Sequence, residues 1–334
     1  MSRMVCAMPD ALVWNLAQRG ACVELEARLQ LPIPSFGPEG LDTVKIMHAA
    51  MHVAARNDHA DALKLMLEWC KAHGIALSPV RRTGLVRWRD YPLLHIAASF
   101  GSVHALAVLI AYGTGLDTPF YGEYWKGTTT LTMALCGRQE AAVELLLRVK
   151  ARVDAVATTL CPLLTAAKED WVWGVKRLLE AKADANAPNG DFGETAVRIA
   201  VTHCPGPACL RALLDARAAV NILATEDGRS PLHLAVRAGG RTHIVYALLA
   251  ARADVGQVTA VARLESFARD GDTAFLMAAE RRPLCPTMLR ALLKAKSDIH
   301  ARDRNGCSAV RRAIQLEYDD TVEWLLRAKA DVDK

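Results

Sequence analysis

One short segment recurs along this chain at nearly constant intervals. Each copy has a Leu-Leu pair and a basic residue four positions after the first leucine. The first residues of five successive copies lie 35, 35, 44 and 33 residues apart. A period of this length indicates an array of small modules that pack on their neighbours, in place of one central core. The five copies are LLEAKADAN (178–186), LLDARAAVN (213–221), LLAARADVG (248–256), LLKAKSDIH (292–300) and LLRAKADVD (325–333), and a sixth, LLLRVKARVD, ends at Asp154.

The residues before each copy predict a pair of helices. In GRSPLHLAVRAGG (228–240), Ser230 is a favourable N-cap residue and Pro231 suits the first helical position. Apolar residues then follow at helical spacing until Gly239, after which a second apolar run leads into the Leu-Leu pair. Each repeat is therefore expected to be a helix, a turn and a second helix. Leu178 and Leu179 are expected to be buried, so that truncation of either to alanine lowers stability by about 2–5 kcal/mol.

The first half of each repeat resembles the ankyrin-repeat family, whose unit of about 33 residues carries a T-P-L-H-x-A signature. The segments with this resemblance are SPLHLA (230–235), LLHIAASFG (93–101), AAMHVAARNDH (49–59), GETAVRIA (193–200), GTTTLTMAL (127–135) and GDTAFLMAA (271–279). The resemblance implies an all-α ankyrin-repeat solenoid of about eight helix-turn-helix repeats plus a degenerate N-terminal capping unit.

The expected domain organisation follows from these segments. Residues 1–43 hold a degenerate N-terminal helical cap and a Pro-rich connector, because DALVWNLAQRGACVELEARL has a decayed repeat pattern and LPIPSFGPEG contains three prolines. Residues 44–334 hold the ankyrin-repeat array. Its repeats are placed near 44–78, 88–117, 125–154, 157–186, 191–221, 226–256, 269–300 and 304–333.

Composition restricts where such a chain works. A hydrophobic fraction of 52% excludes general disorder, and no apolar run approaches the roughly 20 residues of a membrane-spanning helix. The nine cysteines are an odd number, scattered along the chain, and the N-terminus lacks the apolar core of a secretion signal. We therefore expect free thiols and an intracellular location, cytoplasmic or nuclear.

Three joints between repeats are longer than the others. Family members bind proteins through turn tips and the concave face of the first helices, so the resemblance implies a non-catalytic interaction scaffold or adaptor. The first joint (78–92) surrounds a tryptophan with arginines and the second (116–127) is rich in aromatic residues, which are types enriched at interface hot spots. These tips are predicted to bind another protein or peptide of acidic character, unless the rings fold back over the stack. The candidate contact residues are Arg81, Arg82, Arg87, Trp88, Arg89, Phe120, Tyr121, Tyr124 and Trp125. The third joint (255–271) is predicted to pack as a short extra helix.

A basic residue replaces the glycine that the family usually has after the second helix. A non-glycine residue in the left-handed conformation expected there costs about 1–2 kcal/mol, and a cation at a helix C-terminus recovers about 0.3–1 kcal/mol. The alternative function is a polyanion-binding module, for nucleic acid or acidic lipid, that uses this ridge. Against it stand the mild net charge of +5 and the acidic residues beside the ridge, so nucleic acid is not the expected partner. The basic ridge consists of Lys150, Lys182, Arg217, Arg252, Lys296 and Lys329.

Catalytic and metal sites find little support. His48 and His52 have helical ligand spacing, but Ala49 stands where a zinc protease has its glutamate. His52, His95 and His233 occupy the signature histidine position, where the family uses the imidazole to tie adjacent turns. Phosphate-binding loops and nucleophile elbows are absent from the sequence, so we expect no enzyme, no cofactor and no small-molecule substrate.

The cysteines leave one chemical alternative open. Cys204 and Cys209, with His203 beside them, lack a second pair at zinc-ligand spacing, and we expect no metal. An enzyme with an unrecognised Cys/His site would reveal itself as one cysteine that reacts far faster than the rest. Asn186 and Asn221 resemble the asparagines that asparaginyl hydroxylases modify in this family, which would make the chain a substrate.

Overall fold

Helices form the whole regular structure of the residues that the computed structural model describes, which are 9–30, 40–74, 92–120, 127–154, 161–188, 193–223, 228–239, 241–259 and 271–330. Within these residues there are 18 helices and no strands, only isolated bridges such as Phe120 to Thr128. The all-α repeat fold is thereby confirmed. None of the helices in this part of the chain is long and apolar enough to span a bilayer.

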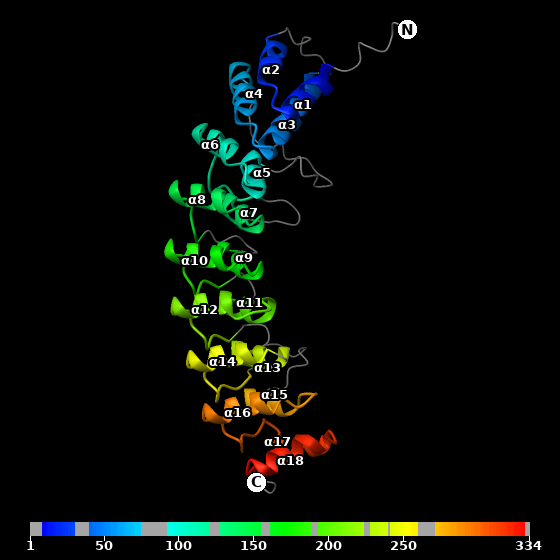
Figure 1. Ribbon diagram of the computed structural model, residues 1–334, viewed down its shortest axis with the longest axis vertical. Coiled ribbons are helices and arrows are strands. Elements are labelled where there is room, and N and C mark those ends of the chain that lie inside the picture. The colour runs from blue at the N-terminus through cyan, green and yellow to red at the C-terminus, as the bar shows by residue number, and fades with distance from the viewer. Residues whose placement is uncertain are drawn as a thin grey trace, which may run out of the picture. The chain divides into compact units, whose positions relative to one another are not determined.

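The chain divides into two compact units, residues 1–162 and 163–334. In the N-terminal unit the helices form four antiparallel pairs, and Figure 1 shows α5 beside α7 and α6 beside α8. Helices α1 and α2 lie within residues 1–43, the range predicted to hold the N-terminal cap and the connector. The bounds are α1 (Pro9–Arg19), α2 (Cys22–Leu29), α3 (Gly40–Arg56), α4 (Ala60–Ala72), α5 (Leu93–Phe100), α6 (Val103–Ala111), α7 (Thr130–Cys136) and α8 (Glu140–Arg148).

The C-terminal unit contains five further pairs. In the first four of them, the first helices α9, α11, α13 and α15 lie along one side and the second helices α10, α12, α14 and α16 lie along the other (Figure 1). The helix pairs fall inside the predicted repeat ranges, except that α3 begins at Gly40, four residues before the predicted start of the array. The bounds are α9 (Pro162–Lys168), α10 (Val172–Glu180), α11 (Ala196–His203), α12 (Ala208–Asp215), α13 (Pro231–Ala238), α14 (Thr242–Ala250), α15 (Ala274–Ala279), α16 (Pro286–Lys294), α17 (Ala309–Gln315) and α18 (Asp319–Arg327).

Hydroxyl side chains begin most of the first helices. Ser230 accepts a hydrogen bond from the backbone N–H of His233, and the His233 ring accepts one from the Ser230 N–H, which completes a capping box with Pro231 at the first position. Thr129, Thr195, Thr273 and Ser308 accept the corresponding N–H of α7, α11, α15 and α17. An N-cap of this kind contributes about 1 kcal/mol to the stability of its helix. The start of these first helices is therefore determined by residues that are neighbours in the sequence.

The third residue of the first helix ties one repeat to the next at three places in the described residues. Nε2 of His95 lies 3.1 Å from the Thr128 carbonyl oxygen, and Nε2 of His233 lies 3.1 Å from that of Asp272. Both acceptors come directly before the N-cap of the next first helix, so the predicted structural role of His95 and His233 is confirmed. In α11 the same position holds Arg198, which donates from Nη1 to the Arg229 carbonyl at 2.5 Å.

The recurring Leu-Leu segment is the end of each second helix, closed by a Schellman motif. In α10, the N–H of Lys182 binds the Leu179 carbonyl and the N–H of Ala183 binds the Leu178 carbonyl, both at 3.0 Å. Lys182 has φ 69°, which confirms the left-handed conformation expected for the basic residue. The other ridge residues have φ 63° (Lys150), 61° (Arg217), 61° (Arg252), 68° (Lys296) and 66° (Lys329).

The two leucines of this segment differ in burial. Leu178 is fully buried and packs beneath the turn, whereas Leu179 is half-buried. The expectation that both are buried is therefore wrong for Leu179. The Schellman geometry explains the difference, because it directs the first leucine and the alanine after the basic residue inward, while the second leucine contributes its backbone carbonyl.

The last repeat contains a buried ionic group. Arg312 of α17 stands where α13 has the buried Leu234, four residues after the N-cap, and is only 2% exposed. Its guanidinium pairs with the carboxylates of Asp272, Asp303 and Glu280, the last at 3.0 Å. The joint between α15 and α17 is thus closed by charges in an interior that is apolar in other repeats.

Candidate protein-interaction surface

Most of the predicted contact residues lie outside the described residues. For the first joint these are Arg81, Arg82, Arg87, Trp88 and Arg89, and for the second they are Tyr121, Tyr124 and Trp125. The third joint, predicted to form an extra helix, also lies largely outside the described part of the chain, in residues 260–270. The structure describes both ends of the second and third joints and the C-terminal end of the first.

Phe120 is the one candidate contact residue that the structure describes, and it points inward. Its side chain is 8% exposed, and its ring centroid lies 6.1 Å from that of His95. For this ring the alternative is correct: it folds back over the stack and is not available to a partner. Its position next to a buried imidazole explains why an aromatic residue occurs there.

The C-terminal end of the first joint lies near the two ends of the second joint. Pro92 ends the first joint and is the N-cap of α5, and the Phe120 N–H binds the Thr128 carbonyl at 2.8 Å, so the second joint leaves and re-enters the fold at one place. The same Thr128 carbonyl lies 3.1 Å from Nε2 of His95. Phe120 and Thr128, which flank the second joint, thus lie beside the helix that follows the first joint.

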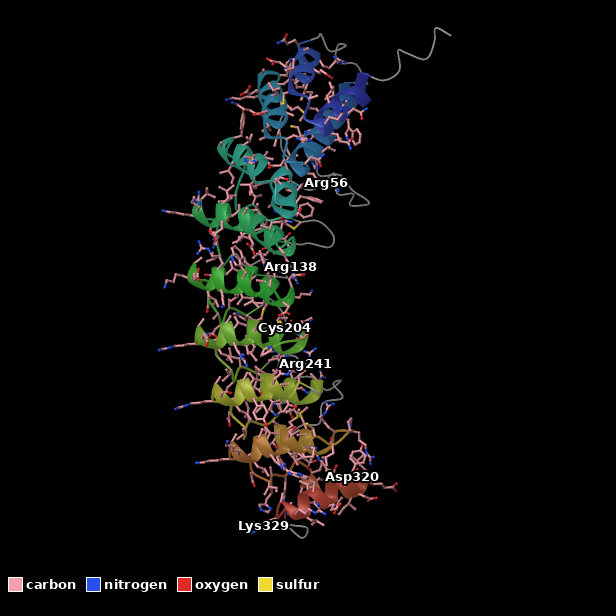
Figure 2. The ribbon with its side chains drawn as sticks, viewed as in Figure 1. Arg56, Arg138, Cys204, Arg241, Asp320 and Lys329 are labelled. Atoms are coloured by element: carbon pink, nitrogen blue, oxygen red, sulfur yellow. The ribbon has the colours of Figure 1, made fainter. Side chains whose placement is uncertain are left out.

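A second arginine and aromatic pair occurs where first helices of the N-terminal unit end. The Arg56 guanidinium carbon lies 4.6 Å from the centroid of the Phe100 ring, and Phe100 is 50% exposed. Arg138 is also exposed at such a turn, and Figure 2 marks both arginines. Sequence reasoning missed this pair because the two residues lie in different repeats, and only their stacking places them together.

The ridge cations of the C-terminal unit all occupy equivalent turns. Acidic residues two positions later lie in the same turns: the carboxylate oxygens of Asp184, Asp254 and Asp298 accept backbone N–H groups at 2.8–2.9 Å. These carboxylates keep negative charge close to the cations. The polyanion-binding alternative therefore stays a prediction, which salt-independent failure to bind heparin resin would contradict.

Two asparagines join successive repeats at this edge. Oδ1 of Asn186 accepts the Ala219 N–H at 2.7 Å, and Oδ1 of Asn221 accepts the Asp254 N–H at 2.9 Å. Both amides thus support the neighbouring turn. Their hydroxylation remains a prediction.

The histidines are mostly structural in their surroundings. Burial lowers the pKa of His48, and it lowers the pKa of His95 to about 4 against the opposing effect of its hydrogen bond to Thr128. His52 is 4% exposed. His203 is exposed, and its Nδ1 lies 2.7 Å from the Thr202 hydroxyl oxygen. His203 is next to Cys204 in the sequence, but it is not among the residues whose ligand atoms cluster with the two thiols.

Two thiol environments stand out among the described cysteines. Cys204 and Cys209 are buried next to the Asp170 carboxylate, and the ligand atoms of these three residues all lie within 4.8 Å of one another. Hydrogen bonding to Cys209, burial and the Asp170 carboxylate together raise the pKa of the Cys204 thiol. Sequence reasoning identified the two cysteines and missed Asp170, which lies in the preceding repeat.

The other environment surrounds Cys285, which precedes α16. Burial opposes ionisation of this thiol, but hydrogen bonds from Thr287, the Met288 N–H and Thr242, together with the charge of Arg281, lower the pKa of Cys285. By contrast, burial raises the pKa of Cys70 to about 11. Cys285 is therefore the residue that we expect to react fastest in a thiol profile.

Comparison with known proteins agrees with the geometry of the repeats. The model of ankyrin repeats in three copies matches residues 51–157, 94–189 and 163–259, which together cover more than half of the chain. The chain therefore belongs to the ankyrin-repeat family. Proteins with this fold are generally interaction modules and are typically non-catalytic.

Individual relatives are more distant. The human B-cell lymphoma 3 protein is 33% identical over 151 residues, an alignment that spans 36% of this chain and 33% of that protein. The chain thus matches about a third of the length of this curated relative.

Two solved structures share the fold. One is the ankyrin repeat domain of Bcl-3, a member of the IkappaB family (TM-score 0.58, 22% identity, covering 70% of this chain and 97% of that one). The other is the human ASB11 ankyrin repeat domain (TM-score 0.53, 24% identity, covering 70% and 96%).

Proposed function

We propose that this chain is a non-catalytic scaffold or adaptor that binds another protein through the tips of its first two long joints. The binding residues in this proposal are those of the two tips, without Phe120. They are Arg81, Arg82, Arg87, Trp88, Arg89, Tyr121, Tyr124 and Trp125.

The attachment of the second joint beside the C-terminal end of the first joint is the observation that supports this proposal. The Thr128 carbonyl accepts from the Phe120 N–H and lies 3.1 Å from the His95 ring, so the second joint is attached beside α5, the helix that follows the first joint. Two segments attached near each other form a composite surface, and a fixed attachment reduces the entropy that is lost when they bind. Arginine and large aromatic side chains are the types that dominate binding energy in such surfaces.

The arginines of the first tip specify the chemistry of the partner. Four guanidinium groups within 81–89 favour a peptide or protein surface with carboxylate groups, because arginine binds carboxylates through paired hydrogen bonds. Such a complex is expected to form more slowly as ionic strength rises. The location of the protein in the cytoplasm or nucleus is part of the same proposal.

Affinity capture with two matched double variants tests the proposal. Trp88→Ala with Trp125→Ala is expected to lose a partner that the wild-type chain retains, with an unchanged melting temperature, because each truncated hot-spot residue costs about 2 kcal/mol or more in binding. Trp14→Ala with Tyr246→Ala is the control, since both rings are exposed (36% and 51%) outside these joints.

The comparison between the variants decides the result. Loss of the partner in the joint variant alone supports the proposal. Retention of every partner by the joint variant, or equal loss in the control variant, would contradict it. Repetition at two salt concentrations separates the contribution of the arginines from that of the rings.

A further inference from the structure

The turn between α11 and α12 departs from the pattern of the other repeats. In the turns after α3 and α9, Asp58 and Asp170 have left-handed backbones, with φ 60° and 50°. The turn after α11 begins instead with Cys204 in an extended conformation, with φ −74° and ψ 130°, followed by Pro205, Gly206 and Pro207. Two prolines restrict the backbone here and hold the Cys204 thiol in a buried position.

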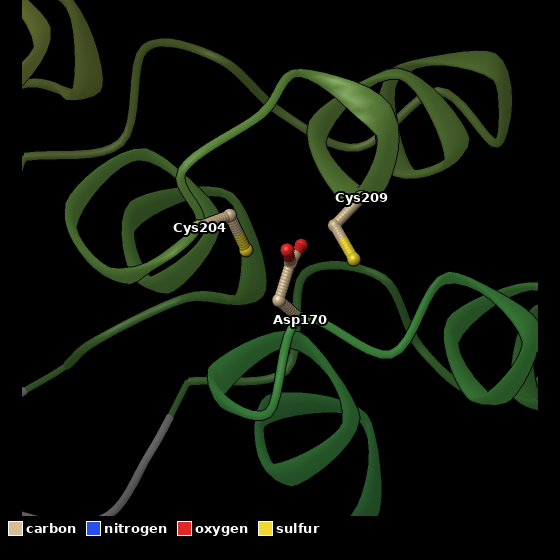
Figure 3. Close-up of side chains that lie close together, drawn as sticks. All are labelled: Asp170, Cys204 and Cys209. Atoms are coloured by element: carbon tan, nitrogen blue, oxygen red, sulfur yellow. The ribbon is translucent and has the colours of Figure 1, made fainter.

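This turn brings three metal-ligating groups together. Figure 3 shows the Asp170 carboxylate between the sulfur atoms of Cys204 and Cys209, and the three ligand atoms lie within 4.8 Å of one another. Both thiols are fully buried, while Asp170 is half-buried and leaves a route for an ion from solvent. The three residues come from two successive repeats of the C-terminal unit.

The corresponding aspartate in the N-terminal unit, Asp58, has a different set of partners. There, Oδ1 of Asp58 accepts the Ala105 N–H at 2.8 Å, and Oδ2 lies 2.7 Å from Nδ1 of His104. The hydrogen bond to Asp58 and the charge of its carboxylate raise the pKa of His104, which favours the protonated ring as the partner of Asp58. Asp170 corresponds to Asp58 and Cys209 to His104, each the second residue of its helix. A thiol supplies no positive charge, so Asp170 has no histidine partner here and lies instead beside two thiols that can bind a metal ion.

We propose that Asp170, Cys204 and Cys209 bind a zinc ion, with one carboxylate oxygen and two thiolates as ligands and water in the fourth position. Thiolates select soft ions such as zinc, and the carboxylate favours a divalent ion over Cu(I). In tetrahedral zinc sites with Zn–S bonds of about 2.3 Å, ligand atoms are about 3.5–4 Å apart, which small side-chain rotations reach from the present positions.

Binding changes the bonds of both thiols. Each S–H group loses its proton to solvent as its sulfur forms a bond to the ion, so two protons are released for each ion bound. Cys204 then gives up the hydrogen bond that its thiol donates to the Ala167 carbonyl at 3.2 Å. The ion would link the repeat of α9 and α10 to that of α11 and α12, and would stabilise the folded state in proportion to its occupancy.

Cobalt substitution on the full chain tests this site. Reduced, metal-free protein titrated with Co²⁺ is expected to bind one equivalent and to develop the near-ultraviolet charge-transfer band of cobalt–thiolate bonds, which one equivalent of Zn²⁺ then removes. Cys204→Ala and Cys209→Ala are expected to lose most of the band. Asp170→Asn is expected to keep a band and to weaken binding by more than about tenfold.

Cys70→Ala and Cys161→Ala are the matched controls, because both thiols are buried outside the cluster. Alkylation of the wild-type chain followed by mass spectrometry gives a readout that needs no variant: Zn²⁺ is expected to protect Cys204 and Cys209 and to leave the other cysteines unchanged. Absence of a thiolate band in the wild-type chain, equal loss of the band in the controls, or uniform protection of all cysteines would overturn the proposal.

Discussion

The joint between α5 and α7 and the joint between α15 and α17 both connect successive first helices, but their chemistry is opposite. The first is closed by a neutral imidazole, His95, bonded to a backbone carbonyl. The second is closed by Arg312 among Asp272, Asp303 and Glu280. The comparison shows that successive repeats can be joined either by a neutral hydrogen bond or by a buried ionic group. The two closures should therefore respond differently to mutation and to pH.

Removing the guanidinium has the largest expected effect. Arg312→Leu leaves the carboxylates of Asp272 and Asp303 buried without their cation, which should lower the free energy of unfolding by about 3–5 kcal/mol. Urea denaturation and hydrogen exchange at α17 measure the loss, and Arg312→Lys, which keeps the charge, is expected to recover part of it. A leucine variant as stable as the wild type would show that the ionic closure contributes nothing.

The two joints should differ in the pH at which acid destabilises them. Because burial holds the pKa of His95 at about 4, an unfolded chain with an ordinary histidine pKa of 6.5 binds a proton that the folded chain does not. The contribution of His95 to the free energy of unfolding is therefore fully present above pH 6.5. It is lost as the pH falls from 6.5 to 4, by at most about 3 kcal/mol. Hydrogen exchange at α5 and α7 is expected to accelerate over this range, and His95→Gln should abolish the dependence.

The ionic joint should respond only at lower pH. Burial raises the pKa of the Asp303 carboxyl, but the hydrogen bond and charge of Arg312 outweigh it and hold that pKa below the usual 3.8. This carboxylate therefore stabilises the fold above pH 3.8, and its contribution is lost as pH falls through the lower folded value. Equal acceleration of exchange at α17 and at α5 near pH 5 would refute the distinction.

The contact of Arg198 combines features of the two joints: its side chain is charged, as in the ionic joint, but its partner is a backbone carbonyl, as for His95. Arg198→Met should lower stability by about 1.5–3 kcal/mol through loss of the bond to the Arg229 carbonyl. Arg198→His is the matched variant, because histidine at this position makes the equivalent bond in α5 and α13. It is expected to retain more stability at pH 7 than the methionine variant and to become sensitive to acid. A methionine variant with wild-type exchange at α11 and α13 would exclude a role for this bond.

The smallest effect is expected at a turn that both regions share. Lys182→Gly relieves a left-handed backbone that costs a lysine about 1–2 kcal/mol, partly offset by the greater chain entropy of glycine and the lost charge at the helix end. A net stabilisation of up to about 1 kcal/mol should appear as a small rise in the urea midpoint. Lys182→Ala, which keeps the strain, is the control. A fall in stability for the glycine variant would show that the charge at the helix end matters more than the strain.

The sequence predicts this fold well where the determinants are local. Ser230 with Pro231, and the basic residue four positions after Leu178, identify a helix start and a helix end from neighbouring residues alone. The ties between repeats could be predicted only at the signature histidines, and Arg198 shows that a different residue type performs the same task.

The remaining features depend on contacts that are distant along the chain. The partners of Arg312 lie up to 40 residues away, and Asp170 lies a full repeat before Cys204. Spacing within one segment carries no information about either. Phe120 failed as a contact residue for a related reason, since its orientation is set by His95 of the preceding repeat.

The acceptor in the ties from His95, Arg198 and His233 is a main-chain oxygen. Such an oxygen is present whatever amino acid occupies the position, so the joint imposes no choice of side chain on the loop that leads to it. Loops between repeats can therefore change composition, lengthen or be grafted from another array without dismantling the framework. Recognition and architecture are in this way free to diversify independently.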